Sequence, residues 1–129
     1  MKWQGLLRFL VIGVGVLAFS ALAQAQEHKA WIEIEPENSH LKIKAYCLNN
    51  TSENANLRYK LTAWKLGKSG RTSTAQSGYV CLQGQEEKCL SQLGLGVSPK
   101  DEYEIKLEVY KDGKLVTEDF VVYSRGTWI

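Results

Sequence analysis

Residues 102–123, EYEIKLEVYKDGKLVTEDFVVY, carry the strongest indication of the fold. In residues 102–110, apolar and charged side chains alternate with a period of two, which is typical of a strand with one buried face. KDGK at 111–114 then supplies an Asp-Gly pair, the strongest short-range signal for a hairpin turn. Residues 115–123 return as the partner strand. This stretch therefore predicts an antiparallel β-hairpin.

The same alternation occurs upstream in WIEIE (31–35), HLKIKAYC (40–47) and NLRYKLTAW (56–64). RTSTAQSGYVCL (71–82) and EKCLSQLGLGV (87–97) are weaker strand candidates, and VSPKD (97–101) is typical of a turn. The seven candidate strands are short and fairly evenly spaced, and no segment after the first 25 residues has convincing helical periodicity. The chain is therefore predicted to be all-β, an immunoglobulin-like antiparallel β-sandwich of about seven strands.

The N-terminus has the features of a secretory signal peptide. It has a basic start with Lys2 and Arg8, an apolar stretch over residues 9–22, and the small-residue ending Ala-Gln-Ala. We expect residues 1–25 to be the signal peptide and residues 26–129 to form a single Ig-like β-sandwich domain. A single membrane anchor is the alternative, because the apolar run is long enough to be ambiguous.

The charge of the exported domain is balanced. The full chain has 16 Lys and Arg residues and 14 Asp and Glu residues. The signal segment holds Lys2 and Arg8 and no acidic residue, so its removal leaves 14 residues of each sign. Net charge therefore gives no reason to expect a nucleic acid partner. Any electrostatic function must come from the local arrangement of charges.

Three cysteines follow the signal segment, in a compartment where disulfides persist. CLQGQEEKC places Cys81 and Cys89 on either side of a polar, glycine-containing segment, so that a hairpin would bring them to bridging distance. We therefore expect a Cys81–Cys89 disulfide, with pairing of Cys47 to either of them as the alternative. The cysteine left over is expected to be a buried thiol rather than a redox group, because the chain has no C-x-x-C motif.

Residues 67–78, GKSGRTSTAQSG, offer a core almost no apolar side chain. Three glycines and several hydroxyls weaken a strand interior and suit a turn that leads into an edge strand. Lys68 and Arg71 add charge to this edge. Charge protects an edge against pairing with other strands, and it can equally select a partner.

Three stretches, taken in order, resemble the periplasmic chaperones of curli assembly, in particular the CsgH branch related to CsgC. They are WIEIEPE (31–37), LRYKLTAWKLGKSGRTSTAQSG (57–78) and VSPKDEYEIKLEVYKDGKLVTED (97–119). The resemblance covers residues 31–119 and rests on the order and spacing of these motifs. The matching residues are Ile32, Ile34, Pro36, Leu57, Tyr59, Leu61, Gly70, Thr72, Gln76, Gly78, Val97, Pro99, Asp101, Tyr103, Leu107, Tyr110, Gly113, Leu115, Val116, Glu118 and Asp119.

The resemblance implies a small Ig-like sandwich in the periplasm. Such a protein holds curli subunits back from premature amyloid formation on their way to the outer-membrane secretion pore, and it is not an enzyme. The expected partners are therefore the curli amyloid subunits and the curli secretion machinery. This chain lacks the Cys-x-Cys pair of the CsgC branch, so the redox activity attributed to CsgC-like proteins is not expected here.

Two surfaces are candidates for partner binding. Amyloid grows by adding extended segments to unpaired strand edges, so a chaperone can bind such a segment through a charged sheet face or an exposed edge. The resemblance implies a basic face, and residues 70–78 predict an edge. Glu33, Glu35, Glu104 and Glu108 are alternative cross-strand partners of the basic residues, which would make an ordinary solvated surface. The candidate residues are Lys42, Lys44, Arg58 and Lys60 on the face, and Arg71, Thr72 and Gln76 on the edge.

No motif for catalysis or metal binding stands out. His28 and His40 are the only histidines, and no Cys/His/Asp spacing resembles a zinc or calcium site. We expect no catalytic residue, metal or cofactor, no nucleic acid partner, no membrane insertion after signal cleavage, and a monomer. The alternative function is an exported β-sandwich module that binds another protein or a carbohydrate at the cell surface.

Overall fold

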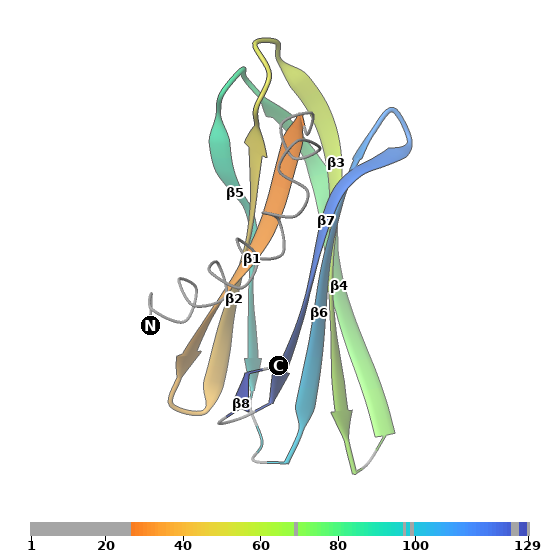
Figure 1. Ribbon diagram of the computed structural model, residues 1–129. Coiled ribbons are helices and arrows are strands. Elements are labelled where there is room, and N and C mark those ends of the chain that lie inside the picture. The colour runs from red at the N-terminus through yellow and green to blue at the C-terminus, as the bar shows by residue number, and fades with distance from the viewer. Residues whose placement is uncertain (1–26, 69, 97, 99, 125–126, 129) are drawn as a thin grey trace, which may run out of the picture.

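A computed structural model describes residues 27–68, 70–96, 98, 100–124 and 127–128. The predicted signal peptide and its cleavage site lie outside this part of the chain. In the part that is described, no helix is long and apolar enough to span a membrane. The strands, labelled in Figure 1, are β1 (His28–Glu37), β2 (His40–Asn49), β3 (Ala55–Gly67), β4 (Gly70–Leu82), β5 (Glu87–Gly96), β6 (Glu102–Lys111), β7 (Lys114–Ser124) and β8 (Thr127–Trp128).

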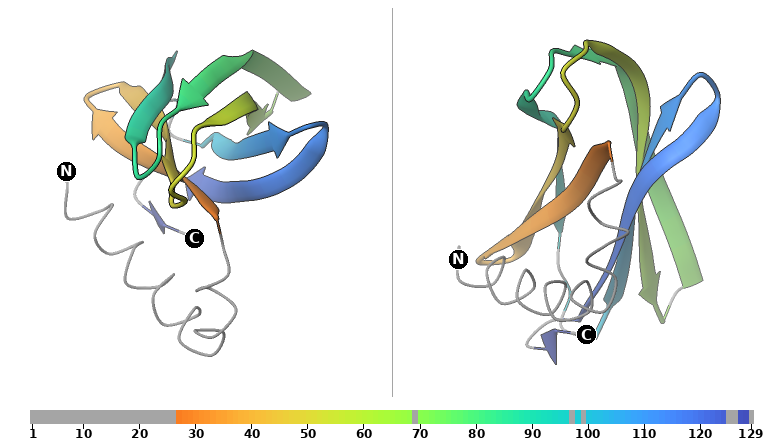
Figure 2. Two further views of the ribbon diagram at one scale, coloured as in Figure 1. Left: turned by 90° about the horizontal axis from the view of Figure 1, so that it is seen from above. Right: turned by 45° about the horizontal axis from the view of Figure 1, so that its top comes forward.

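The strands form two antiparallel sheets that pack face to face (Figure 2). The smaller sheet has the order β1-β2-β5, and the larger has the order β4-β3-β6-β7-β8. These orders correspond to A-B-E and C′-C-F-G of immunoglobulin-like domains, with the two-residue β8 added. The predicted sandwich is confirmed. The two weak candidates are full strands, since β4 has 13 residues and β5 has 10.

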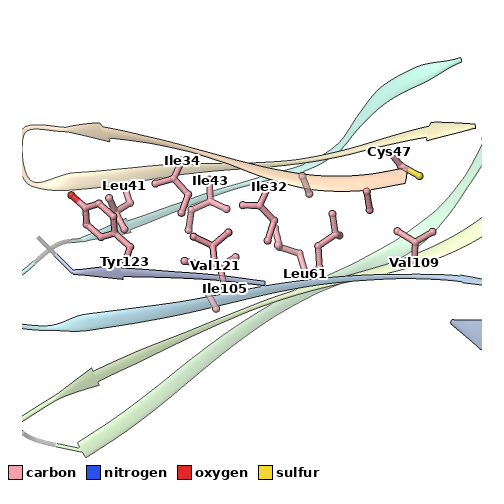
Figure 3. Packing of buried hydrophobic residues seen from close by; sticks show 14 of the residues in the cluster. Ile32, Ile34, Leu41, Ile43, Cys47, Leu61, Ile105, Val109, Val121 and Tyr123 are labelled. Carbon is pink, nitrogen blue, oxygen red and sulfur yellow. The ribbon is translucent and has the colours of Figure 1, made fainter. Parts of the chain in front are cut away.

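The core lies between the two sheets and is built by the period-two alternation of the sequence. Successive side chains of a strand point to opposite faces, so the apolar set of each strand faces inward. Ile32, Ile43, Leu61, Ile105 and Val121 come from five different strands and are all buried in this layer (Figure 3). Full burial of one such side chain contributes roughly 1.5–3 kcal/mol.

Tyr103, near the start of β6, ties the end of β5 to the larger sheet. Its ring is fully buried, and its hydroxyl donates to the carbonyl of Gly96 at 2.8 Å and accepts from the Ser98 backbone N–H at 3.2 Å. A tyrosine in this position, bonded back to upstream backbone, is a hallmark of immunoglobulin-like sandwiches. It fixes the C-terminal end of β5 against the core.

The predicted hairpin forms as expected. β6 and β7 pair antiparallel, and the turn between them has Asp112 at φ 53° and Gly113 at φ 78°. Two successive residues in the left-handed region are what a type I′ turn requires, and Asp-Gly reaches that region at low cost. The strongest local signal of the sequence thus has its expected structure.

Asn49, at the end of β2, holds two loops together at one end of the sandwich. The side chain is fully buried, and its amide nitrogen donates to the carbonyls of Glu53, Leu82 and Gln83 at 2.7, 3.1 and 3.1 Å. The β2–β3 loop is thereby tied to the connection between β4 and β5. A side chain at Gly84 would meet the Ser52 backbone at 2.8 Å, so this contact requires glycine.

The predicted Cys81–Cys89 disulfide is absent, and all three cysteines are free. The connection after β4 carries the chain from the larger sheet to the smaller one instead of forming a hairpin within one sheet. Cys81 is therefore exposed on β4, while Cys89 lies opposite Tyr46 on the smaller sheet. Cys47 is the buried thiol that we expected for one cysteine. Burial raises its pKa to about 11, which keeps it protonated and unreactive.

Candidate functional site

The strand edge on one side of the sandwich is covered. β1 is an edge strand of the smaller sheet, so its alternate N–H groups point away from β2. Ala30 N donates to Thr117 Oγ1 at 3.1 Å, and Ile32 N donates to Asp119 Oδ2 at 2.8 Å, both acceptors lying on β7. These bonds occupy donors that another strand would need. We call this margin, formed by β1 and β7, the closed side.

The opposite margin is formed by β4, the edge of the larger sheet, and β5, the edge of the smaller one; we call it the open side. None of the described strands pairs with the outer edge of either. Ser91 Oγ donates a hydrogen bond to Gln76 Oε1 where the two strands meet. Toward the beginning of β4 the two sheets diverge (Figure 1). The open side therefore presents two unpaired edges.

The first half of β4 is exposed on both of its faces. Residues 70–75 are all exposed, although Thr72 and Thr74 lie opposite Lys65 and Ala63 at positions that point toward the smaller sheet. The smaller sheet has only three strands, and none of them covers these positions. The Gly/Ser/Thr tract thus has no core to fill, which explains its composition. The prediction of an edge strand here is confirmed.

The hairpin of β3 and β4, residues 55–82, is cationic. It contains five basic residues and no acidic residue. Its anionic neighbours come from outside the hairpin: Glu104 lies 3.9 Å from Arg71, and Asp101 lies 3.3 Å from Lys65. A cationic edge repels the same edge of a second copy and attracts anionic chains. The five residues are Arg58, Lys60, Lys65, Lys68 and Arg71.

Lys42 and Lys44, two residues of the predicted basic face, lie on the outer face of the smaller sheet. In the register of β1 and β2, Glu35 is opposite Lys42 and Glu33 is opposite Lys44. Lys44 Nζ is 3.9 Å from Glu35 Oε1, so acidic residues accompany these lysines, as the alternative interpretation had it.

Arg58 and Lys60 lie on the outer face of the larger sheet, which is the other outside surface of the sandwich. The structure therefore does not bring the four predicted basic residues onto one face. The Arg58 guanidinium lies over the Tyr110 ring at 4.9 Å, and Lys60 is opposite Glu108. The Glu108 carboxylate also lies 3.6 Å from the Lys106 ammonium group.

The three predicted edge residues are brought together on β4. Arg71 points outward, where its guanidinium lies over the Trp64 ring at 5.3 Å. Thr72 is exposed beside it, and Gln76 accepts the hydrogen bond from Ser91 of β5. Of the candidate residues, these lie at the margin where strand edges are unpaired.

An aromatic hollow of about 690 Å³ lies on the outer face of the larger sheet, next to the open side. Its lining includes Tyr79, Tyr110, Arg58 and the exposed Cys81. Tyr79 is 84% exposed, the largest such fraction among the exposed large apolar side chains of the described residues. Burial and a hydrogen bond with Glu108 raise the pKa of Tyr110. The sequence analysis missed Tyr79, although continuing the alternation of residues 71–82 places it outward.

His28, at the start of β1, is a buried titratable group away from the open side. Its side chain is only 2% exposed, and neither ring nitrogen has a hydrogen-bond partner. Burial, and then the positive charge of Lys111, lower the pKa of His28 below its ordinary value. In the described part of the chain no group of three or more His, Cys, Asp and Glu residues is placed to hold a metal ion.

No protein-family model and no curated protein sequence matches the chain. Solved structures do match. The curli protein CsgC of E. coli superposes with a TM-score of 0.60 at 18% identity, covering 72% of this chain and 96% of CsgC. R. palustris CsgH gives a TM-score of 0.55 at 16% identity, covering 70% of this chain and 89% of CsgH.

A sandwich of this shape also occurs within larger proteins. A Bacteroides uniformis β-glucuronidase matches with a TM-score of 0.57 at 12% identity, covering 76% of this chain but only 14% of the enzyme. At such identities the likeness shows a shared fold. The structural similarity to CsgC and CsgH agrees with the resemblance read from the sequence, and unlike the glucuronidase match it covers most of the other protein.

Proposed function

We propose that the protein is a periplasmic chaperone of the curli type, which binds aggregation-prone segments of curli subunits transiently and prevents their premature polymerisation before secretion. The observation that carries this proposal is the open side, where two strand edges are unpaired on a sandwich that resembles CsgC and CsgH. The signal-like segment at residues 1–25 supports export to the periplasm. The subunits and their secretion machinery are the proposed partners.

The mechanism follows from the hydrogen bonding of amyloid. A fibril grows when an extended segment pairs its backbone with an unpaired edge. An edge on a soluble domain offers the same backbone partners, but the rest of the sandwich prevents further stacking. Thr117 and Asp119 occupy two backbone donors of β1, so we assign capture to the edges of β4 and β5. The five basic residues of the β3–β4 hairpin disfavour pairing of two chaperones through β4.

The test is fibril formation by a purified curli major subunit, followed by dye fluorescence, with the exported protein added well below equimolar amounts. We expect a much longer lag, because an edge-binding protein acts on rare nuclei and growing ends. Thr74→Asp adds an acidic side chain at the exposed inner position of β4 and is expected to shorten the lag again. Ser39→Asp, in the exposed β1–β2 turn, is the matched control and should leave the lag unchanged.

No delay of fibril formation at equimolar protein, with the fold verified, would contradict the proposal. It would favour the second candidate, an exported module that binds another protein or a carbohydrate. The hollow beside Tyr79 and Tyr110 supports that candidate, because exposed aromatic rings are common at binding surfaces. Chemical-shift changes at Tyr79 on titration with soluble oligosaccharides would identify it.

A further inference from the structure

Two glycines on β5 have no explanation within the part of the chain that the structure describes. Gly94 and Gly96 are exposed, and a Cβ added to either would meet no atom within 4 Å. Neither has a positive φ, since among the described glycines only Gly70 and Gly113 do. Glycine weakens a strand interior, so it is normally found in a strand where another backbone or a ligand approaches closely. Nothing within the described chain approaches here.

The glycines border the position of a missing strand. In constant-type immunoglobulin domains a fourth strand pairs with the strand equivalent to β5, whereas here β5 is the sheet edge. The regular part of this edge runs from Ser91 to Gly96, because a bulge interrupts the register beside Ala45 and Tyr46. One further strand beside β5 would give the smaller sheet four strands, which is also the number of long strands in the larger sheet.

Apolar side chains on the inner faces of the sheets border the space where this fourth strand would lie. Leu93 and Leu95 of β5 lie opposite Ile43 and Leu41 on the inner face, yet they are only half-buried. The inward positions of β4 at residues 72 and 74 are exposed across the gap. Aliphatic side chains of an added strand would be covered by these two strands, and their burial is favourable.

The protein already shows how it covers a glycine in an edge strand. Gly78 on β4 lies opposite Tyr59 on β3, and a Cβ at Gly78 would be 2.8 Å from the Tyr59 hydroxyl. The aromatic side chain therefore lies over the glycine of the neighbouring strand. Such pairing of an aromatic with a cross-strand glycine stabilises edges of sheets.

We propose that a partner segment binds as a fourth strand beside residues 91–96 of β5, with aromatic side chains at two alternate positions that lie over Gly94 and Gly96. This inference rests on the proposed function and deepens it by naming the chemistry of the segment, which is aromatic on its outward face and aliphatic on its inward face. Lys42 lies opposite Gly94, and among the described residues it forms no ion pair, so its ammonium group is available to an aromatic ring over that glycine.

A second copy of this chain does not fit this space as well. β5 reads EKCLSQLGLG and contains no aromatic residue, so two β5 strands with aligned outer faces would place Gly94 and Gly96 opposite glycine or Gln92 and leave the glycines uncovered. The occupant is therefore a segment of another protein, and self-association becomes an outcome that the test must detect.

The test uses the exported protein and two synthetic peptides in which inward-facing valines alternate with outward-facing residues. Two of the outward-facing residues are tyrosines in one peptide and alanines in the other. Binding is measured by backbone chemical-shift changes. We expect the tyrosine peptide to bind about tenfold more tightly and to shift residues 91–96. In the double variant Gly94→Val with Gly96→Val this preference should disappear, because the valines occupy the space of the rings. Valine favours strands, so the fold is retained.

Gln92→Val, on the same outer face of β5, is the matched control and should keep the preference for tyrosine. Equal binding of the two peptides by the wild type, or an undiminished preference in the glycine double variant, would overturn the inference. A doubled molecular mass without peptide would also overturn it by identifying a second copy as the occupant. In the fibril assay, a double variant that delays fibril formation as much as the wild type would contradict only this inference. A wild type that does not delay fibril formation would contradict the proposed function.

Discussion

Individual side chains decide which edges of this sandwich are available. Thr117 and Asp119 sit two residues apart on β7 and accept hydrogen bonds from backbone donors of β1, whereas the edges of β4 and β5 have no strand beside them in the described structure. A short polar side chain at the correct register removes one donor from an edge, because it satisfies an N–H that a new strand would use.

Asp119→Ala is expected to lower the free energy of unfolding by about 1–3 kcal/mol, because the Ile32 N–H loses a charged acceptor in a partly buried position. Denaturant unfolding measures this change. Glu118→Ala, an exposed neighbour on the same strand, is the control and should change stability by less than about 0.5 kcal/mol. Equal effects of the two substitutions would show that the Asp119 carboxylate does not hold β1.

His28 is expected to make the protein less stable in mild acid. Its pKa in the folded protein is lowered from 6.5, first by burial and then by Lys111, so below pH 6.5 the unfolded chain binds a proton that the folded chain does not. The free energy of unfolding therefore falls as pH decreases from 6.5 toward the lowered pKa, and below that pKa this contribution becomes constant.

Urea unfolding between pH 8 and pH 5 measures this effect. His28→Leu should remove part of the pH dependence, whereas His40→Leu, at an exposed position, should retain it. A wild-type pH dependence that His28→Leu leaves unaltered would assign the loss of stability to other groups.

At the scale of elements, β4 combines two different halves. Its second half alternates inward and outward and ends at the buried Leu82, while residues 70–75 are exposed on both faces. Backbone hydrogen bonds that are open to water and lack covering side chains break in local fluctuations of low free energy. The first half of β4 is thus the part of the open side most able to adapt to a partner.

Hydrogen exchange tests this difference. We expect the amides of residues 70–75 to exchange on the order of a hundredfold faster than those of residues 104–109 at the centre of β6, which is paired on both sides. Similar protection in the two segments would contradict the picture of a loosely held first half.

The elements differ in how far local sequence determines them. The β6–β7 hairpin was predictable because its turn chemistry and its alternation lie within one continuous stretch. β4 and β5 gave only weak signals, since β4 has an uncovered half and β5 carries two glycines. The disulfide prediction failed because CLQGQEEKC was taken as a hairpin, whereas the chain changes sheets between Cys81 and Cys89.

At the scale of the whole molecule, charge is distributed unevenly over a neutral domain. The charged residues of the β3–β4 hairpin are all basic, and the acidic residues lie elsewhere, with three on β1 and three on β6. An acidic partner is therefore steered toward one margin of the sandwich, and this steering weakens as salt is added.

Reversing charge at two places tests this asymmetry. Lys60→Glu with Lys68→Glu is expected to slow association with the fibril-forming subunit about tenfold at low salt, with a smaller effect at high salt. Lys111→Glu with Lys114→Glu makes the same change in net charge at the β6–β7 turn and should have little effect. Equal slowing by both pairs in kinetic measurements would mean that only net charge matters.

The class of fold, the main strands and the side chains of each strand that face the core could be predicted from the sequence, because alternation and turn chemistry are local properties of the chain. The basic residues that share a face, the positions of the cysteines and the edges that stay open became known only from the packing of the two sheets. Those properties depend on pairing between strands far apart in sequence. The bonds that close β1 join residues 87 positions apart, and no local pattern specifies which strand lies beside another at that distance.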